Sequence, residues 1–140
     1  MKKIWTLMAG VALLSSAAFG AALNKDVTIE NTPPSVVKTT PQCGEIAVDP
    51  TISEISVVFS KDMQNGCMWS ICAIDQKSFP KLGVNIRFLE DKRTCVIPVT
   101  LERGKTYALW FNHGSFNNFM DEQGNPSIPY LLIFKTKTGR

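Results

Sequence analysis

The sequence predicts an all-β protein, a sandwich of two antiparallel sheets built from seven short strands. Segments in which hydrophobic and polar residues alternate recur along the chain, and this period of two is typical of strands with one buried face. Gly, Pro, Asn and Asp lie between the segments, where chain reversals need them. No stretch keeps the 3.6-residue period of an amphipathic helix. Seven such segments are typical of one sandwich domain, which we place at residues 35–138.

Each expected strand is bounded by a turn signal. In chain order we expect the strands at residues 35–39, 54–60, 68–74, 84–89, 94–99, 106–112 and 130–136. The turn signals lie at residues 41–44, 49–50, 65–66, 90–92, 103–104 and 124–126. Alternation in the second, sixth and seventh strands assigns an inward face, which consists of Ile55, Val57, Phe59, Tyr107, Leu109, Phe111, Tyr130, Leu132 and Phe134. These side chains should interdigitate between sheets about 10 Å apart.

Residues 1–22 have the layout of a secretory signal peptide. Two lysines are followed by an apolar run over 4–14 and by small residues over 15–22. The apolar run is shorter than the roughly 18–20 residues that a membrane anchor needs. We expect cleavage after Gly20 or Ala22, which gives a periplasmic or secreted protein that is not stably inserted in a membrane.

Composition narrows the classes of partner. The chain has 140 residues, of which 44% are hydrophobic, and this is too apolar for intrinsic disorder. Lys and Arg number 15 against 12 Asp and Glu, and no basic block concentrates the excess, so we expect no nucleic-acid binding. Residues 23–34 are mostly polar and end in two prolines, which predicts an extended leader before the sandwich.

The four cysteines follow the expected signal peptide. An even number of cysteines in an oxidising compartment predicts disulfides and no free thiol. The C-x4-C spacing of Cys67 and Cys72 does not suit zinc, and a catalytic thiol would have only one histidine to act as its base. The expected strand positions slightly favour one set of two disulfides, Cys67–Cys95 and Cys43–Cys72. The other set, Cys72–Cys95 and Cys43–Cys67, stays open, because a one-residue change in register swaps which of Cys67 and Cys72 faces inward. The cysteines concerned are Cys43, Cys67, Cys72 and Cys95.

Other side chains that could carry chemistry lack the necessary partners. The loop 121–125 has no acidic residue at the final position of an EF-hand and is better explained as a turn. The run 113–115 contains His and Ser, but a hydrolase also needs an oriented acid. Nothing in the sequence brings Asp62 and Glu90 together as a carboxylate pair. We therefore expect no catalytic residue, no metal and no cofactor.

A series of motifs runs in a fixed order from Pro33 to Thr138. The motifs are Pro33-Pro34-Ser35-Val36-Val37, Thr40-Pro41-x-x-Gly44, Val48-Asp49-Pro50, Ile55-Ser56-Val57-Val58-Phe59-Ser60-Lys61-Asp62-Met63, Leu101-x-x-Gly104-Lys105-Thr106-Tyr107, Asp121-x-x-Gly124-Asn125-Pro126 and Phe134-Lys135-Thr136. This order resembles the bacterial Ig-like domain of S-layer and other cell-envelope proteins.

Further motifs are similar to those of a subgroup that occurs as stand-alone exported proteins or attached to exported enzymes. These are Trp69-Ser70, Phe79-Pro80, Thr94-Cys95-Val96 and Asn117-x-Phe119. The resemblance implies an Ig-like sandwich with a binding or spacer role, and it supplies no catalytic residue. Cys43 and Cys67 depart from the family's pattern.

The sequence therefore predicts an exported, non-enzymatic Ig-like module that binds or spaces partners in the cell envelope. The alternative is a small exported enzyme or inhibitor on the same scaffold, because fold does not fix function. A candidate interaction face consists of Ala108, Trp110, Leu131 and Ile133, which lie opposite the inward residues of the last two strands. Large apolar patches mark association sites, so we expect a protein partner or a second copy, and a carbohydrate ligand stays open. Residues 24–34 or 116–120 could instead cover this face.

Overall fold

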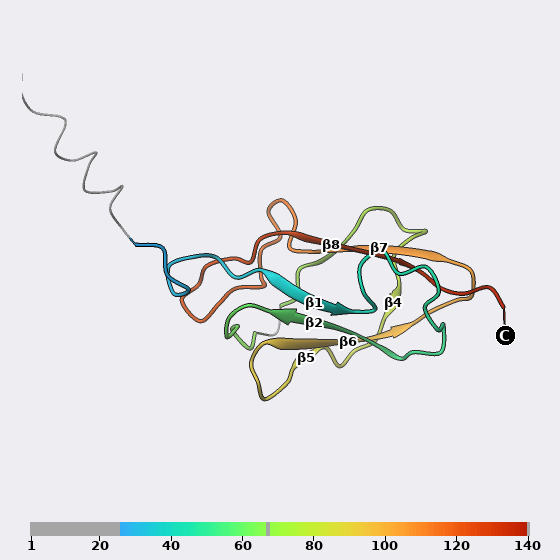
Figure 1. Cartoon of the computed structure of the whole chain (residues 1–140), viewed down its shortest axis with the longest axis horizontal. Helices are drawn as coiled ribbons and strands as arrows, with labels where there is room; N and C mark the ends of the chain where they lie inside the picture. The colour runs from blue at the N-terminus through green and yellow to red at the C-terminus, as the bar shows by residue number, and fades with distance from the viewer. Residues whose placement is uncertain (1–25, 67, 140) are drawn as a thin grey trace, which may run out of the picture.

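The computed structural model describes residues 26–66 and 68–139, which form two facing antiparallel sheets (Figure 1). The larger sheet contains β1 (Val36–Thr40), β2 (Glu54–Phe59), β4 (Lys81–Leu82), β5 (Arg87–Phe88) and β6 (Thr94–Thr100). The smaller sheet contains β3 (Ile71–Ala73), β7 (Thr106–Phe111) and β8 (Tyr130–Lys135). Within the two described ranges there is no helix that could cross a membrane.

The strand order is that of an Ig-like sandwich. The larger sheet runs β1-β2-β6-β4 with β5 also paired to β6, and the smaller sheet runs β3-β7-β8. This is the arrangement of an Ig constant-type domain. The hydroxyl of Tyr107 accepts a hydrogen bond from the backbone N–H of Glu102 at 2.8 Å, as in the tyrosine corner of such sandwiches. The predicted fold class is confirmed, with eight strands in place of seven.

The additional strand is β4, which lies just before the expected strand 84–89, and the expected strand itself is shortened. The expected strand 84–89 is represented by β5, and β4 precedes it on the same edge of β6. Gly83 donates its backbone N–H to the Pro98 carbonyl at 2.8 Å, so Pro98 faces this edge. Proline has no N–H to donate. The ladder therefore breaks beside Pro98, and Val84 in the break is fully exposed.

The core matches the predicted inward face. The predicted residues of β2 and β7 are all buried, as are Leu132 and Phe134 of β8, while Tyr130 is half-buried. Phe119, from the loop before β8, stacks on Phe59 with ring centroids 5.4 Å apart. It also meets Phe111 edge-on at 6.0 Å. Period-two alternation therefore identified the core of the sandwich correctly.

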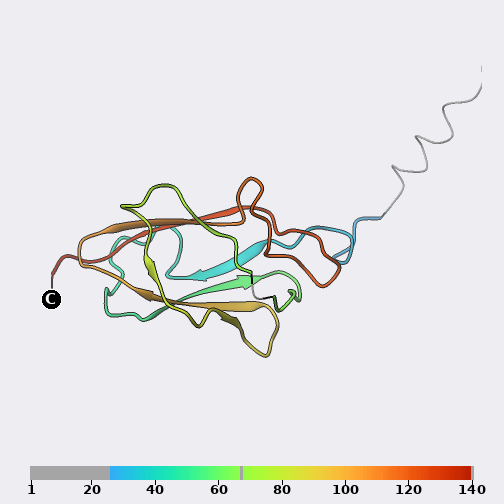
Figure 2. The same cartoon turned by 180° about the vertical axis from the view of Figure 1, so that it is seen from behind.

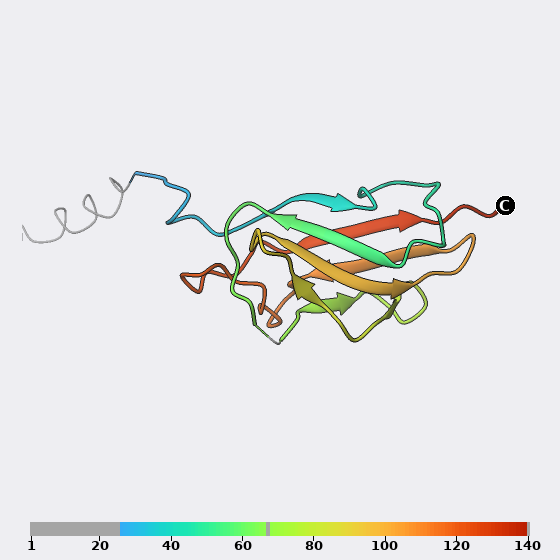
Figure 3. The ribbon, with the colours of Figure 1, turned by 90° about the horizontal axis from the view of Figure 1, so that it is seen from below.

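The two edges of the smaller sheet differ. Residues 44–48 run beside the outer edge of β8: Gly44 donates its N–H to the Ile133 carbonyl at 2.7 Å, and Lys135 donates to the Glu45 carbonyl at 2.8 Å. At the opposite edge, the expected strand 68–74 is reduced to the three residues of β3. The chain then crosses to the larger sheet, as Figure 2 shows. Figure 3 views the sandwich through the larger sheet, with β7 and β8 behind it.

Candidate interaction face

The four residues of the predicted face lie together on the outer surface of the smaller sheet. Ala108 is directly opposite Ile133, and Trp110 is directly opposite Leu131, across β7 and β8. The residues between them on both strands point into the core, so these four point outward. On the other side of β7, Cys72 is directly opposite Trp110 and extends the row onto β3. We call Ala108, Trp110, Leu131 and Ile133 the Trp110 face.

Exposure varies across the Trp110 face. Ile133 is 40% exposed, Trp110 and Leu131 are half-buried, and Ala108 is buried. Ala108 donates its backbone N–H to the Ser78 carbonyl at 2.9 Å, so the segment after β3 continues the sheet next to this residue. The His113 ring packs on Trp110 with centroids 4.8 Å apart. The face is thus accessible mainly at Ile133 and partly at Trp110 and Leu131.

The described part of the leader lies away from this face (Figure 1), and the loop 116–120 is anchored in the core by Phe119. The described part of the leader lies beyond one end of the sandwich (Figure 1), where Lys61 donates to the carbonyls of Glu30 and Thr32 at 3.2 and 3.0 Å. In the loop 116–120, Phe119 enters the core instead of covering the outer surface. Phe116 of the same loop is largely exposed.

A groove lies along β3. The groove has a volume of about 400 Å³ and is lined by Trp69, Ser70, Ile71, Cys72, Ala73 and Phe116. Exposed apolar side chains lie on either side of β3 in the sequence, namely Met68 and Ile74. Apolar surface therefore continues from the Trp110 face to this edge of the sheet.

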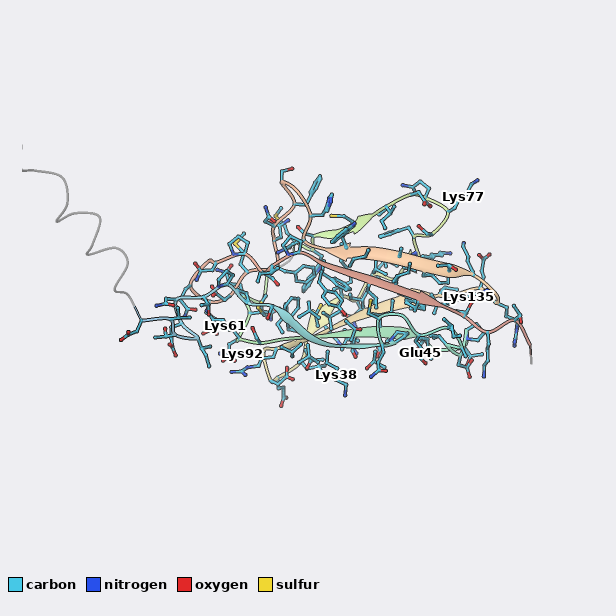
Figure 4. All side chains as sticks on the ribbon, turned by 45° about the horizontal axis from the view of Figure 1, so that its top comes forward. Lys38, Glu45, Lys61, Lys77, Lys92 and Lys135 are labelled. Carbon is cyan, nitrogen blue, oxygen red and sulfur yellow. The ribbon has the colours of Figure 1, made fainter. Side chains whose placement is uncertain are left out.

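The loop 121–125, which the sequence predicts to be a turn and not a calcium site, is held by a buried ion pair. Lys61 lies 2.6 Å from a carboxylate oxygen of Asp121, and the side chains are 7% and 0% exposed. Asp121 also accepts hydrogen bonds from the backbone N–H groups of Gln123 and Asn125 and from the Asn125 amide. Both carboxylate oxygens are engaged, so the loop is the turn that the sequence predicted. Figure 4 shows Lys61 at the leader end of the sandwich.

The pair determines the charge state of Asp121. Burial acts to raise the pKa of this carboxyl, but the hydrogen bonds from Lys61 and Asn125 outweigh burial and hold the pKa below its ordinary value. No group of three or more His, Cys, Asp or Glu side chains suited to a metal occurs in the described ranges. Of the two carboxylates considered as a pair, Asp62 is bound to Arg93 at 2.8 Å.

The expected disulfides that can be tested are wrong. Cys43, Cys72 and Cys95 carry free thiols. Cys72 points outward beside Trp110, whereas Cys95 lies opposite Val57 in the core of the other sheet, so 72–95 cannot form in this register. Cys43 lies beyond β8, where its thiol donates to the Leu131 carbonyl at 3.4 Å. Three strand spacings, roughly 14 Å, then separate Cys43 from Cys72 across β8 and β7, which exceeds the reach of a disulfide.

The bonds 67–95 and 43–67 involve Cys67, which lies outside the described residues, but the thiols of their other partners, Cys95 and Cys43, are free. Burial raises the pKa of Cys95 to about 12. Its thiol therefore stays protonated at neutral pH, and it lacks the thiolate that reacts with disulfides or metals.

Sequence reasoning missed the Lys61–Asp121 pair, although the signal was present. Alternate residues from Ile55 to Met63 are all buried, and Lys61 occupies one of these positions. Continuing the period of two beyond Phe59 would have placed Lys61 inside the sandwich. A buried lysine requires an acidic partner, and the loop 121–125 carries one.

Comparisons with known proteins agree with this geometry. A family model described as a bacterial Ig-like domain matches residues 30–136. Domains 1–6 of the surface layer protein SbsC superpose with a TM-score of 0.53 at 16% sequence identity. The match covers 79% of this chain and 14% of that protein, so this chain spans a small part of its length. No curated protein matches the sequence.

Proposed function

Because the chain belongs to the bacterial Ig-like domain family, we propose that it is an exported, non-enzymatic module of the cell envelope that binds a protein partner. The Trp110 face is the proposed binding surface. The segment 1–22 and the likeness to a surface layer protein support the proposed location. Residues 35–138 form the binding domain of this proposal, and residues 23–34 form its leader.

The observation that carries the proposal is the contrast between the two outer surfaces. An outward sheet face that contacts only water is usually polar. The outer face of the larger sheet is mixed: Val58, Val96 and Pro98 alternate there with polar residues, and Glu54 and Arg87 form an ion pair at 3.1 Å across it. The corresponding rows of the smaller sheet contain tryptophan, leucine, isoleucine and alanine. A partly exposed apolar patch that contains a tryptophan is typical of a binding surface.

A non-enzymatic role is supported by the positions of the buried polar groups. Lys61 and Asp121 neutralise each other, and Asn112 bonds to the backbone of Phe119 and Ser127. The Thr136 hydroxyl bonds to the backbone around the Tyr107 corner. Each of these groups stabilises a loop or a strand end.

We expect Trp110→Ser to abolish partner capture while changing the free energy of unfolding by no more than about 1 kcal/mol. Trp110 is half-buried on the outer surface, so its removal leaves the core intact. The test immobilises purified protein, exposes it to an envelope extract of the host, and identifies captured proteins by mass spectrometry. The matched control is Val84→Ser, at a fully exposed apolar residue of the other sheet.

Proteins retained by the wild type and by Val84→Ser, but lost from Trp110→Ser, would support the proposal. Equal capture by all three proteins would mean that the binding surface is not the Trp110 face. Unfolding of Trp110→Ser in the absence of any partner would assign Trp110 to the core.

A further inference from the structure

The free edge of β3 presents backbone groups that have no partner in the described structure. Asn112 of the segment after β7 donates its N–H to the Ser70 carbonyl at 2.9 Å, so Ser70 faces β7. In a strand, residues alternate in the direction of their backbone groups, so Cys72 also faces β7, whereas Ile71 and Ala73 face away. No hydrogen bond to the backbone of Ile71 or Ala73 exists on that side within residues 26–66 and 68–139.

We propose that this edge pairs with β3 of a second copy, and that a disulfide between the two Cys72 residues holds the resulting dimer. In an antiparallel pair centred on Cys72, Ile71 of each copy is opposite Ala73 of the other, and each such pair exchanges its N–H and C=O groups. The edge is therefore complementary to itself about a two-fold axis, as a symmetric dimer requires. The two smaller sheets would join into one continuous sheet.

The same register brings the two thiols together. Because the backbone groups of Cys72 face β7, Cys72 and its symmetry mate form a non-hydrogen-bonded pair, whose Cα atoms lie about 4.5 Å apart. Disulfide-bonded cysteines have Cα atoms about 4.4–6.8 Å apart, so the geometry suits a bond. Side chains of directly opposite residues lie on the same face, and Cys72 is half-exposed with a free thiol.

The size of the contact explains why a covalent bond is needed. A stable interface buries about 1,200–2,000 Å². Three residues of β3, with Met68, Ile74 and Phe116 as apolar neighbours, supply less than this, so the non-covalent dimer is weak. The weak pairing orients the thiols, and the disulfide then makes the association persistent.

The bond forms by two thiol–disulfide exchanges with a small-molecule disulfide such as oxidised glutathione. One Cys72 thiol loses its proton, and the thiolate attacks a sulfur of the small disulfide and releases one thiolate. The Cys72 thiolate of the second copy then attacks the mixed disulfide and releases the other. Two protein thiols are oxidised, and one small disulfide is reduced to two thiols. Burial raises the pKa of Cys72, so dimerisation should accelerate as the pH increases.

The experiment incubates the purified protein with oxidised glutathione at about pH 8.5. Wild type should give a covalent dimer on light scattering, and its non-reduced peptide map should contain a 72–72 bond that dithiothreitol breaks. Cys72→Ser should remain monomeric. Cys43→Ser is the matched control, because Cys43 is more exposed than Cys72, and it should dimerise like the wild type.

A second pair of variants tests the strand edge separately from the thiol. Ala73→Pro removes an outward N–H at an edge position where proline is tolerated, and it should slow dimerisation by about tenfold or more. Ala73→Ser keeps the N–H and should dimerise normally. In the oxidised wild type, hydrogen exchange at the Ile71 and Ala73 amides should become slower than in the monomer, which requires no variant.

Dimers linked through Cys43, a bond between Cys72 and Cys67 of one chain, or an Ala73→Pro variant that dimerises as fast as the wild type would each overturn the proposal. The inference is separable from the proposed function, because Trp110→Ser should still dimerise and Cys72→Ser should still capture the partner.

Discussion

Lys61→Met is expected to lower the free energy of unfolding at neutral pH by about 3–5 kcal/mol. The substitution keeps the length and apolar stem of the side chain but leaves the Asp121 carboxylate buried without its cation. It also removes the hydrogen bonds that attach the leader at Glu30 and Thr32. A loss of this size is a large part of the roughly 5–15 kcal/mol that stabilises a typical domain.

The pH dependence should identify the cause of this loss. In the wild type, the lowered pKa of Asp121 contributes stability above the carboxyl's unfolded value, and this contribution disappears as the pH falls through the folded pKa. In Lys61→Met, the unpaired carboxylate should have a raised pKa and should be stabilised by protonation. The difference in unfolding free energy between the two proteins should therefore shrink as the pH is lowered.

Urea unfolding across a pH series measures this difference, with Lys92→Met as the matched control. Lys92 bonds to Glu122 at 3.2 Å, and both side chains are largely exposed. Its loss should change stability by about 0–1 kcal/mol. Equal effects of the two substitutions, or a Lys61→Met effect that does not change with pH, would contradict a stabilising role of the buried pair.

Leu109→Ala is expected to cost about 2–5 kcal/mol. Leu109 is fully buried at the centre of β7, opposite Leu132 in the sheet, and it faces the inner side chains of the larger sheet. Truncation removes apolar contacts and leaves a cavity that the two rigid sheets cannot close. The midpoint and slope of urea unfolding provide the measurement.

Ile133→Ala is the control for this truncation. Ile133 lies on β8, but it points outward and is partly exposed, so its truncation should cost less than about 1 kcal/mol. If Leu109→Ala were no more destabilising than Ile133→Ala, the assignment of the inner and outer faces of this sheet would be wrong.

The sequence predicted those parts of the fold that depend on local periodicity. Alternation in β2, β7 and β8 identified the core, because one-sided burial imposes a period of two on the side chains. Strand β4 and the shortening of the expected strand 84–89 were missed, since the break between β4 and β5 is caused by Pro98 of the neighbouring strand and not by residues 84–89 themselves. The position of such a break in a strand depends on which distant segment of the chain pairs with it.

The cysteine pairing shows the same limit. Cys72 faces outward because Ile71 pairs with Phe111, and a shift of one residue would have directed Cys72 into the core. Register within a short edge strand depends on its partner, so the sequence left two pairings open. The Trp110 face was predictable as a set of neighbours, but the burial of Ala108 depends on the course of the chain near Ser78.

Site-specific photo-crosslinking in the host tests the binding role of the Trp110 face most directly. A benzophenone amino acid replaces Ile133 on this face or Val84 on the larger sheet, since both side chains are exposed. Irradiation of intact cells should join position 133, but not position 84, to a partner protein that migrates as a discrete adduct. No adduct at position 133, or the same adducts at both positions, would contradict a binding role for this face.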